Sequence, residues 1–322
     1  MKPDSSAIVA SAHDAMASEY DCVDDPWYTH LFATVHAELL RAARGIERSA
    51  AGAKALDVGC GTGLQSWLLA DAGFDVDGFD LSEGLLEVAR GKALAAPTWS
   101  PANAFDQQMQ RAHDEAVRIR ATRPKGAVRL FRGDAGDAQC FQGGPYDLVN
   151  CVGSVLSFVG EPDAVLCHMR DACSPGGAIV LECEMKANLD LVWPLVDRIV
   201  GGRLRYGQTW REALTNPFAL GPRDVETVYP FELKSGEDVE LPMRLFSHRR
   251  MAQRFAAAGL AVVRSRAVHC VTNAIPSTVL HNRLSGWLSK VYGVLERADR
   301  ALGGTWPFRR LGCSCIFTLR RM

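Results

Sequence analysis

A run of glycines between an apolar strand and a helix constrains the fold of this chain more than any other feature. Residues 55–64, with the sequence ALDVGCGTGL, place three glycines directly after a short apolar stretch. Glycine permits tight turns and a close approach of a ligand to the backbone. The free N–H groups at the start of the following helix favour a polar or anionic ligand. The pattern therefore predicts a ligand-binding turn between a strand and a helix.

A carboxylate at the end of the next strand indicates the kind of ligand. The expected strand over residues 75–79 ends at Asp80, which lies 21 residues after Gly59. A carboxylate in this place can accept hydrogen bonds from both ribose hydroxyls of a nucleoside. Loops that bind dinucleotides have the spacing G-x-G-x-x-G, whereas here Leu64 stands where the last glycine would be. The spacing favours a nucleoside without a pyrophosphate.

Short apolar runs alternate with helical patterns along most of the chain. The expected strands cover residues 54–58, 75–79, 128–132, 146–151, 178–184, 261–268 and 313–319. The expected helices cover residues 64–72, 82–94, 105–120, 162–173 and 248–258. Strands that alternate with helices predict βαβ units and a parallel sheet.

Insertions interrupt this alternation after the second, fifth and sixth strands. Residues 186–246 contain a helical stretch at 189–200 and two β-like runs at 225–233 and 239–246, which a turn at Lys234-Ser235-Gly236 would join into a hairpin. Insertions of this size beside a parallel sheet usually build a lid or a substrate pocket. The expected divisions are a helical cap at 1–50, a nucleoside-binding core at 51–185 and a lid insertion at 186–246. Residues 247–322 form the final part of the core, with a helical insertion at 276–310.

Composition excludes several classes of protein. The 322 residues are 48% hydrophobic, and 36 basic against 37 acidic side chains give a net charge of −1, which is unlike a nucleic-acid-binding protein. No apolar stretch approaches the roughly 18 residues of a membrane span. The first residues make a poor signal peptide, so we expect a cytoplasmic protein. The ten cysteines contain no C-x-x-C pair, and we expect no metal site.

Four further segments, together with the glycine loop, resemble the motifs of class I S-adenosylmethionine-dependent methyltransferases. They are FDLS at 79–82, GDA at 133–135, YDLV at 146–149 and SPGG at 174–177. Five motifs in one order are far more specific than any one of them. The resemblance covers residues 20–185 and resumes at 247–270 and 313–320. It implies a Rossmann-like α/β fold with a seven-stranded sheet, mostly parallel with the last strand antiparallel, and with helical and hairpin lid insertions.

The resemblance also implies S-adenosylmethionine as cofactor and a role for individual residues. Asp57 would anchor the methionine amino group, directly or through water, Asp80 would hold the ribose, and Leu81 would flank the adenine. Asp134 and Ala135 would contact the amino edge of the adenine. Replacing Asp80 with Ala would then weaken cofactor binding and hardly change the stability of the fold. The remaining expected cofactor-binding residues are Gly59, Cys60, Gly61, Gly63, Cys151, Val152 and Tyr20.

Within this superfamily the chain is similar to the glycine and sarcosine N-methyltransferase branch. The similar stretches are residues 61–89 and 151–159. A tyrosine of the N-terminal segment meets the cofactor carboxylate in that branch, which makes Tyr20 the candidate here. The branch usually carries Gly-Asn-Ser where this chain has Gly153-Ser154-Val155. This departure puts a glycine-like acceptor in doubt.

The candidate catalytic residues on the acceptor side are Tyr28, Ser154 and His281. Methyl transfer needs positioning of the nucleophile and, where the nucleophile is protonated, a base. His281 is a candidate base, with a surface histidine as the alternative. Either Glu182 or Glu184 faces the pocket, or both are charges at a solvent-facing strand end. For two aromatic residues of the lid, Tyr206 and Trp210, the alternatives are caging a substrate and packing the lid.

The sequence thus predicts an enzyme that methylates N or O of a small-molecule metabolite or natural product and releases S-adenosylhomocysteine. One alternative is an O-methyltransferase specific for a phenol or a carboxylate. Another is a non-catalytic regulatory protein that binds S-adenosylmethionine. No nucleic acid, membrane or metal partner is expected, and a homo-oligomer stays open. Acceptor specificity lies in the insertions, which the motifs do not describe.

The N-terminal segment 13–36 is predicted to close over the bound cofactor. Its aromatic residues precede the first strand, and Pro26 biases Asp25 away from helical geometry and so permits a hinge. The alternative is a helix packed permanently on the core. Limited proteolysis near residues 13–26 should be fast without ligand and markedly slower with S-adenosylhomocysteine. Equal rates in both states would leave only the packed helix.

Overall fold

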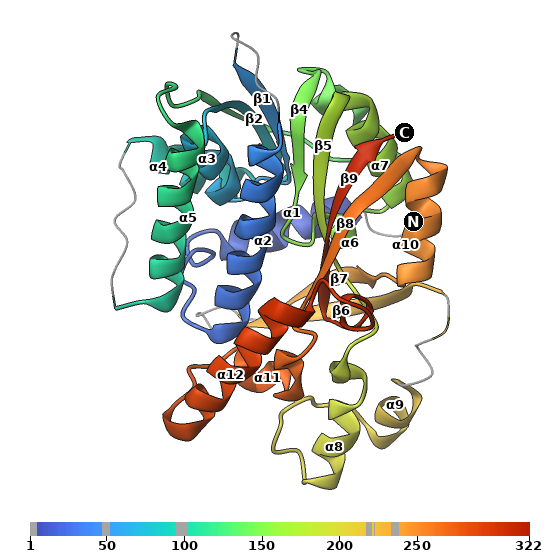
Figure 1. Cartoon of the computed structure of the whole chain (residues 1–322). Coiled ribbons are helices and arrows are strands. Elements are labelled where there is room, and N and C mark those ends of the chain that lie inside the picture. Colours follow the sequence, from blue (N-terminus) through green and yellow to red (C-terminus); the bar gives the residue numbers. More distant parts are fainter. Residues whose placement is uncertain (1–4, 47–51, 95–101, 217–220, 222, 233–237) are drawn as a thin grey trace.

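A seven-stranded sheet with the order β3-β2-β1-β4-β5-β9-β8 runs through the centre of the molecule (Figure 1). The computed structural model describes residues 5–46, 52–94, 102–216, 221, 223–232 and 238–322. The strands are β1 (Ala53–Val58), β2 (Phe74–Asp80), β3 (Val128–Arg132), β4 (Tyr146–Cys151), β5 (Cys173–Glu184), β8 (Leu260–Val268) and β9 (Ser314–Arg321). β9 is antiparallel to both of its neighbours, and the other pairings are parallel. The predicted sheet is confirmed.

Helices cover both faces of this sheet. On one face pack α2 (Pro26–Arg44), α3 (Leu64–Asp71) and α5 (Ala104–Arg120), and on the other α7 (Pro162–Ala172) and α10 (His248–Ala257). α4 (Glu83–Leu94) follows β2 and contacts α1 (Ser5–Met16). The five predicted core helices agree with these bounds to within one residue at each end. β5 begins five residues earlier than predicted, because Cys173 already pairs with Tyr146 of β4.

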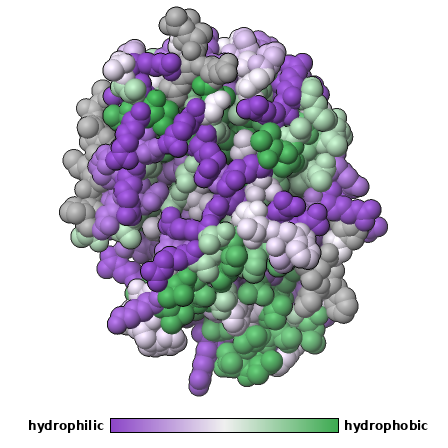
Figure 2. Space-filling model, in the orientation of Figure 1, coloured by the Kyte–Doolittle hydropathy of each residue, from purple (hydrophilic) through white to green (hydrophobic). Residues whose placement is uncertain are grey.

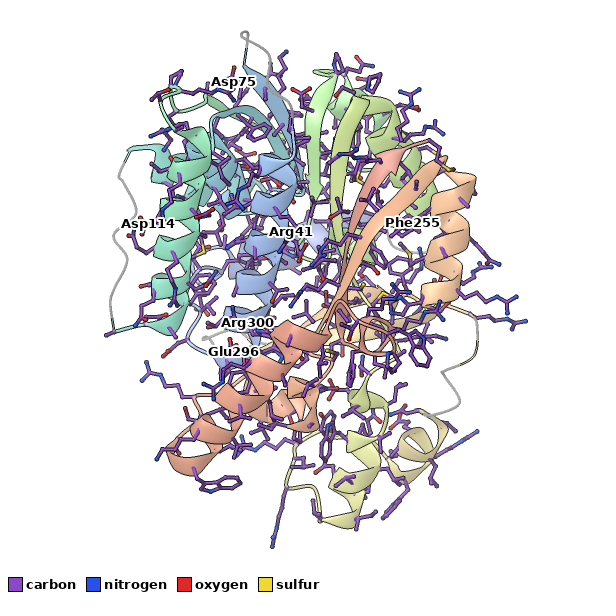
Figure 3. The ribbon with its side chains drawn as sticks, viewed as in Figure 1. Arg41, Asp75, Asp114, Phe255, Glu296 and Arg300 are labelled. Carbon is purple, nitrogen blue, oxygen red and sulfur yellow. The ribbon has the colours of Figure 1, made fainter. Side chains whose placement is uncertain are left out.

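Alternating side chains of the central strands supply both layers of the core. Ile179 and Leu181 of β5 belong to the cluster on one face, and Val180 between them belongs to the cluster on the other. This is the two-residue period of a strand that is buried on both sides. Phe255 of α10 points toward the sheet (Figure 3) and meets the ring of Phe317 at 5.1 Å.

The two later insertions, residues 186–246 and 276–310, gather at the carboxyl end of the sheet, which is the lower end in Figure 1. They contain the hairpin of β6 (Val225–Glu232) and β7 (Asp238–Leu245), and the predicted turn at 234–236 lies outside the described residues. The other elements there are α6 (Val155–Phe158), α8 (Trp193–Ile199), α9 (Trp210–Thr215), α11 (Ser277–Leu280) and α12 (Gly286–Leu302). Figure 2 shows hydrophobic side chains exposed over this region. The exposed large side chains of α12 include Trp287 and Val294.

The helix expected over residues 189–200 is divided into a 3₁₀ turn and α8. The turn η2 spans Leu189–Leu191, and α8 begins at Trp193 with Pro194 in its first turn. Proline lacks the N–H that a continuous helix would need there, but it fits the first turn of a new helix.

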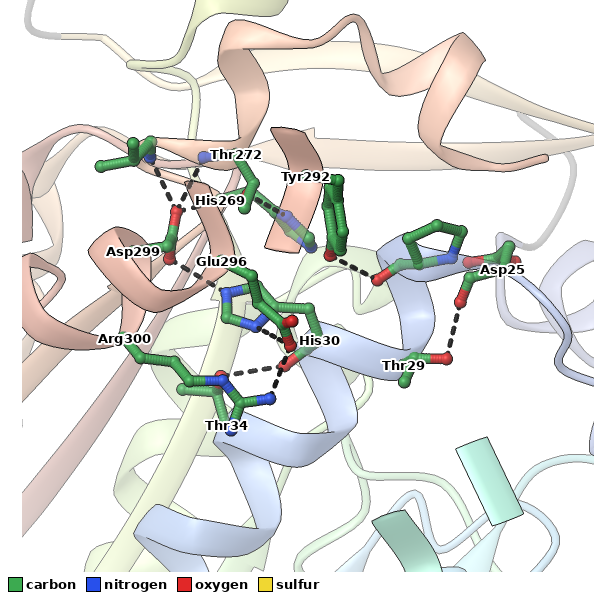
Figure 4. A network of polar contacts seen from close by, with 12 residues as sticks. Asp25, Thr29, His30, Thr34, His269, Thr272, Tyr292, Glu296, Asp299 and Arg300 are labelled. Atoms are coloured by element: carbon green, nitrogen blue, oxygen red, sulfur yellow. Dashed lines mark hydrogen bonds and ion pairs between the residues drawn. The ribbon is translucent and has the colours of Figure 1, made fainter. Parts of the chain in front are cut away.

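A buried polar network joins α2 to α12 (Figure 4). His30 of α2 is only 1% exposed, and its Nε2 lies 3.1 Å from Asp299 Oδ1. Its Nδ1 lies 3.5 Å from Glu296 Oε1. The second oxygen of Asp299 accepts hydrogen bonds from the backbone N–H groups of Val271 and Thr272 at 2.7 and 3.1 Å. The network therefore attaches the late insertion, residues 276–310, to α2.

The carboxylates of Asp299 and Glu296 control the pKa of His30. Burial lowers the pKa of His30, but the hydrogen bonds to Asp299 and Glu296 outweigh burial, so the pKa of His30 is raised above 6.5. Burial opposes ionisation of Asp299 as well, yet the hydrogen bond to His30 keeps the pKa of Asp299 well below its ordinary value. A histidine whose pKa is higher in the folded state than in the unfolded state stabilises the fold most below the unfolded pKa.

Replacing His30 with Gln should therefore cost more stability at low pH than at high pH. At pH 6 we expect a loss of about 3–5 kcal/mol in the free energy of unfolding, because the buried Asp299 carboxylate loses its cation. The loss should shrink as the pH rises through the folded pKa of His30. Urea unfolding between pH 6 and 9 measures the difference.

His248→Gln is the matched control. Burial lowers the pKa of His248 to about 4, so the folded protein holds this histidine neutral throughout the range tested, whereas in the unfolded chain it becomes protonated near its ordinary pKa of about 6.5. Its replacement should therefore cost less at pH 6 than at pH 9, which is the opposite trend to that of His30→Gln. A cost of His30→Gln that does not rise toward pH 6 would contradict the charged network.

Candidate active site

Loops at the carboxyl ends of β1, β2, β3 and β4 enclose a cavity of about 880 Å³, including its mouth. The strand order reverses between β1 and β4, and the crevice at such a reversal is the usual ligand site of open α/β sheets. The predicted residues that line this cavity are Tyr20, Gly59, Cys60, Gly61, Asp80, Leu81, Asp134, Ala135 and Val152. We name it the nucleoside cavity.

The glycine loop has the geometry that the sequence predicted. Gly59, Gly61 and Gly63 have φ values of 65°, 52° and 77°, in the region that strains other residues. A Cβ on Gly59 would lie 2.4 Å from Cγ2 of Val155, so a side chain there would displace the turn after β4. Gly63 caps α3 and does not line the cavity.

Asp80 holds the glycine loop as well as facing the cavity. Its Oδ2 accepts a hydrogen bond from the Gly61 N–H at 2.8 Å, and its Oδ1 accepts one from the Ser82 N–H at 2.9 Å. Burial raises the pKa of Asp80, and these two hydrogen bonds oppose the rise. The sequence did not reveal this second role, and because of it a substitution of Asp80 will also cost stability.

Two expected cofactor contacts lie behind the cavity wall. The Asp57 carboxylate is 1% exposed, and it accepts hydrogen bonds from Ser66 Oγ at 2.5 Å and Asn150 Nδ2 at 2.7 Å. Burial raises the pKa of Asp57 to about 6 against the effect of these bonds. The Cys151 side chain is fully buried in β4. Neither residue lines the nucleoside cavity.

Helix α1 covers the mouth of the nucleoside cavity, which no sequence motif indicated. Val9 and His13 of α1 line the cavity. Asp14 Oδ1 accepts hydrogen bonds from Ser82 Oγ at 2.5 Å and from the Gly84 N–H at 2.9 Å. These bonds attach α1 to the loop after β2, beside Asp80.

A second cavity of about 1540 Å³, including its mouth, lies between the N-terminal segment and the insertions. Its lining includes all three predicted catalytic residues, Tyr28, Ser154 and His281, and it is mainly apolar. It meets the nucleoside cavity along residues that line both, namely His13, Tyr20, Phe32, Gly153 and Phe158. We name it the acceptor cavity. The two cavities together place a bound nucleoside beside a space for a second molecule.

Two glutamates of β5 hold Ser154 in the turn after β4. Ser154 has a φ of 61°, and its N–H donates to Glu182 Oε2 at 2.6 Å. Its Oγ donates to Glu184 Oε1 at 3.0 Å. Glu182 is fully buried, whereas Glu184 lines the acceptor cavity. The structure therefore favours the interpretation in which one of the two faces the pocket, and that residue is Glu184.

His281 lies in the acceptor cavity, not on the surface. Its ring is 5.1 Å from the ring of Trp27 and 5.3 Å from that of Tyr28. Burial lowers the pKa of His281 to about 4, with Asp190 opposing the shift. The imidazole is neutral at pH 7.

The two aromatic candidates of the lid contact other side chains of the insertion. The hydroxyl of Tyr206 donates to Asp190, and Trp210 is 48% exposed against Arg198. Neither lines the acceptor cavity, so packing of the insertion is the interpretation that the structure favours. Cys313 does line it, and its Sγ lies 3.8 Å from Asp190 Oδ2.

Metal and membrane features were searched over the described part of the chain. No group of three or more His, Cys, Asp or Glu side chains there could hold a metal ion. No helix in the same residues has both the length and the apolar character to cross a bilayer.

Comparison with known proteins agrees with this geometry. The profile of the methyltransferase domain family matches residues 28–265, about three quarters of the chain. The ubiquinone biosynthesis O-methyltransferase of Methylococcus capsulatus is 30% identical over 145 residues, which are 44% of this chain and 48% of that protein. That of an Azoarcus species is 33% identical over 129 residues, 40% of this chain and 43% of that protein. The chain therefore matches about half the length of these relatives or less.

A solved structure has the same fold along its whole length. The CcbJ methyltransferase of Streptomyces caelestis superimposes with a TM-score of 0.50 at 18% identity, covering 97% of this chain and 98% of that one. With the glycine loop, the carboxylate after β2 and the family profile in agreement, this chain belongs to the methyltransferase domain family.

Proposed function

We propose that the protein transfers the methyl group of S-adenosylmethionine to a nitrogen or oxygen atom of a small molecule and releases S-adenosylhomocysteine. The observation that carries this proposal is the junction of two cavities at the carboxyl edge of the sheet. One has the loop and carboxylate of a nucleoside site, and the other is a mainly apolar space of a size for a second molecule. A protein that only sensed the nucleoside would not need the second cavity.

The residues of the nucleoside cavity fit the cofactor. A Cβ on Gly61 would lie in ordinary van der Waals contact with Tyr20, 4.0 Å from its Cε1, so this aromatic ring lies beside the glycine loop. In this proposal Asp80 accepts hydrogen bonds from the ribose hydroxyls, and Leu81, Asp134 and Ala135, which line the same cavity, contact the adenine. When bound, the cofactor supplies an electrophilic methyl group on a sulfonium.

The Asp57 carboxylate, in this proposal, supports the site from behind. Both of its oxygens are engaged with Ser66 and Asn150, and it fixes the end of β1 against β4 and α3. An interaction of Asp57 with the methionine amino group would therefore pass through water or through the loop backbone.

We also propose that α1 and the insertions at 186–246 and 276–310 act as the lid of the acceptor cavity. His13 and Met16 of α1 and Leu241 and Met243 of β7 all line that cavity, so the acceptor contacts residues far apart in sequence. Closure around both molecules would exclude water from the reacting methyl group.

The site predicts that Asp80→Ala weakens binding of S-adenosylhomocysteine by about 1–3 kcal/mol, because hydrogen bonds to a buried polar group are lost. Isothermal titration of the folded variant measures this. The melting temperature should also fall, because the N–H groups of Gly61 and Ser82 lose their acceptor.

The matched control is Asp77→Ala on the same strand. Asp77 accepts a hydrogen bond from the Tyr146 hydroxyl at 2.8 Å but does not line the nucleoside cavity. This variant should keep its affinity for S-adenosylhomocysteine even if it loses stability. Equal affinity in Asp80→Ala and the unmodified protein would refute the ribose role.

A further inference from the structure

The Glu184 carboxylate lies in the wall of the acceptor cavity without a cation. It accepts one hydrogen bond, from Ser154 Oγ at 3.0 Å, and no described side chain forms an ion pair with it. A carboxylate removed from water without a cationic partner costs free energy. Because Glu184 lies next to the junction of the two cavities, the missing cation is expected to be a group of the acceptor molecule.

The other charged groups of the acceptor cavity are already occupied. Asp190 accepts hydrogen bonds from the Tyr206 hydroxyl and, at 3.4 Å, from the Ser277 N–H. The Lys186 ammonium donates to two backbone carbonyls of the segment that leads to β6. The titratable side chains that line the cavity are His13, Tyr20, Tyr28, Glu184, Lys186, Asp190, His281 and Cys313. Of the carboxylates among them, Glu184 has the fewest bonds.

Aromatic rings surround the same space. Trp27, Tyr28 and Phe32 of α2 and Phe158 of α6 all line the cavity. Aromatic faces attract cations and pack against apolar frames. A carboxylate among such rings is suited to an organic cation.

We propose that the acceptor is an amine on an apolar frame, and that the Glu184 carboxylate binds its ammonium group and removes a proton from it. This inference rests on the proposed methyltransferase function and names its substrate class. Ser154 is a positioning residue in this arrangement, since its bonds to Glu182 and Glu184 fix the second carboxylate at the wall.

The chemistry balances with the groups already named. An ammonium nitrogen has no free electron pair until one proton passes to a Glu184 oxygen. The freed pair then forms the new N–C bond while the C–S bond of the methyl donor breaks, and the electrons of that bond stay on sulfur. Glu184 afterwards releases its proton to solvent, and the product is a methylated ammonium ion.

The environment of Glu184 supports a role as base. Burial, and then the negative charge of Glu182, raise the pKa of Glu184 to about 8, against the hydrogen bond from Ser154. Below about pH 8, and without a bound ammonium, Glu184 is mostly in the protonated form. Once the group is ionised, above that pH or beside a bound ammonium, it is a stronger base than an ordinary carboxylate and takes a proton from the ammonium more readily. His281, whose pKa is lowered to about 4, is a weaker base.

Three probes of similar shape test the proposal: 2-phenylethylamine, 2-phenylethanol and 3-phenylpropionate. Their binding to the full chain saturated with S-adenosylhomocysteine is measured by isothermal titration and by NMR line broadening. We expect the amine to bind about tenfold more tightly than the alcohol, with the carboxylate weakest, because a charge-assisted hydrogen bond adds to the shared ring contact. Glu184→Gln should abolish the preference for the amine.

Two controls separate this effect from others. Glu161→Gln removes an exposed carboxylate outside both cavities and should keep the preference. Glu184→Gln should bind S-adenosylhomocysteine like the unmodified protein, because Glu184 does not line the nucleoside cavity. That measurement also shows that the variant is folded.

The outcomes are distinguishable. Failure of the amine to bind, an alcohol or carboxylate that binds as tightly as the amine, or a preference that survives Glu184→Gln would each overturn the inference about the acceptor. An alcohol preference would instead indicate an oxygen acceptor. Failure of the unmodified protein to bind S-adenosylhomocysteine would overturn the proposed function itself.

Discussion

The hydrogen bonds of Asp57 fix the point of the fold on which the site depends. One carboxylate, buried at the end of β1, receives the Asn150 amide from β4 and the Ser66 hydroxyl from α3. These elements meet where the strand order reverses, so the loops that follow β1 and β4 open away from each other at a fixed separation. Satisfied buried polar groups of this kind specify one arrangement, because any other would leave a carboxylate unpaired.

Close packing at the same point excludes side chains that would fill the crevice. Gly59 lies so near Val155 that no larger residue fits without moving the turn after β4. That turn carries Gly153 and Ser154 into the junction of the two cavities. The contact between Gly59 and Val155 therefore positions both the glycine loop and the wall of the acceptor cavity. A displacement of either would change the distance between the two bound molecules.

The N-terminal segment and the late insertion complete the acceptor cavity from opposite ends of the sequence. His30 of α2 lies between Asp299 and Glu296 of α12, and the ring of Trp27 stacks on His269 at a centroid distance of 3.7 Å. The late insertion also supplies His281 to the cavity. His30, whose pKa these carboxylates raise, therefore contributes both to the stability of the chain and to the attachment of the late insertion to α2.

The sequence by itself determined the sheet, its helices and most of the nucleoside cavity. Glycine spacing, strand-end carboxylates and apolar periodicity are local features, and local sterics and hydrogen bonding impose them wherever the chain folds. The burial of a side chain could not be predicted where it depends on elements that lie far away along the chain. Only the tertiary structure decided that Asp57 faces inward, that Asp80 braces the glycine loop, and that Glu184 and His281 share one cavity with α1 and β7. These contacts arise from packing between segments that are far apart in the sequence. They could not be predicted from residue spacing, because the insertions that bring the segments together contain no motif.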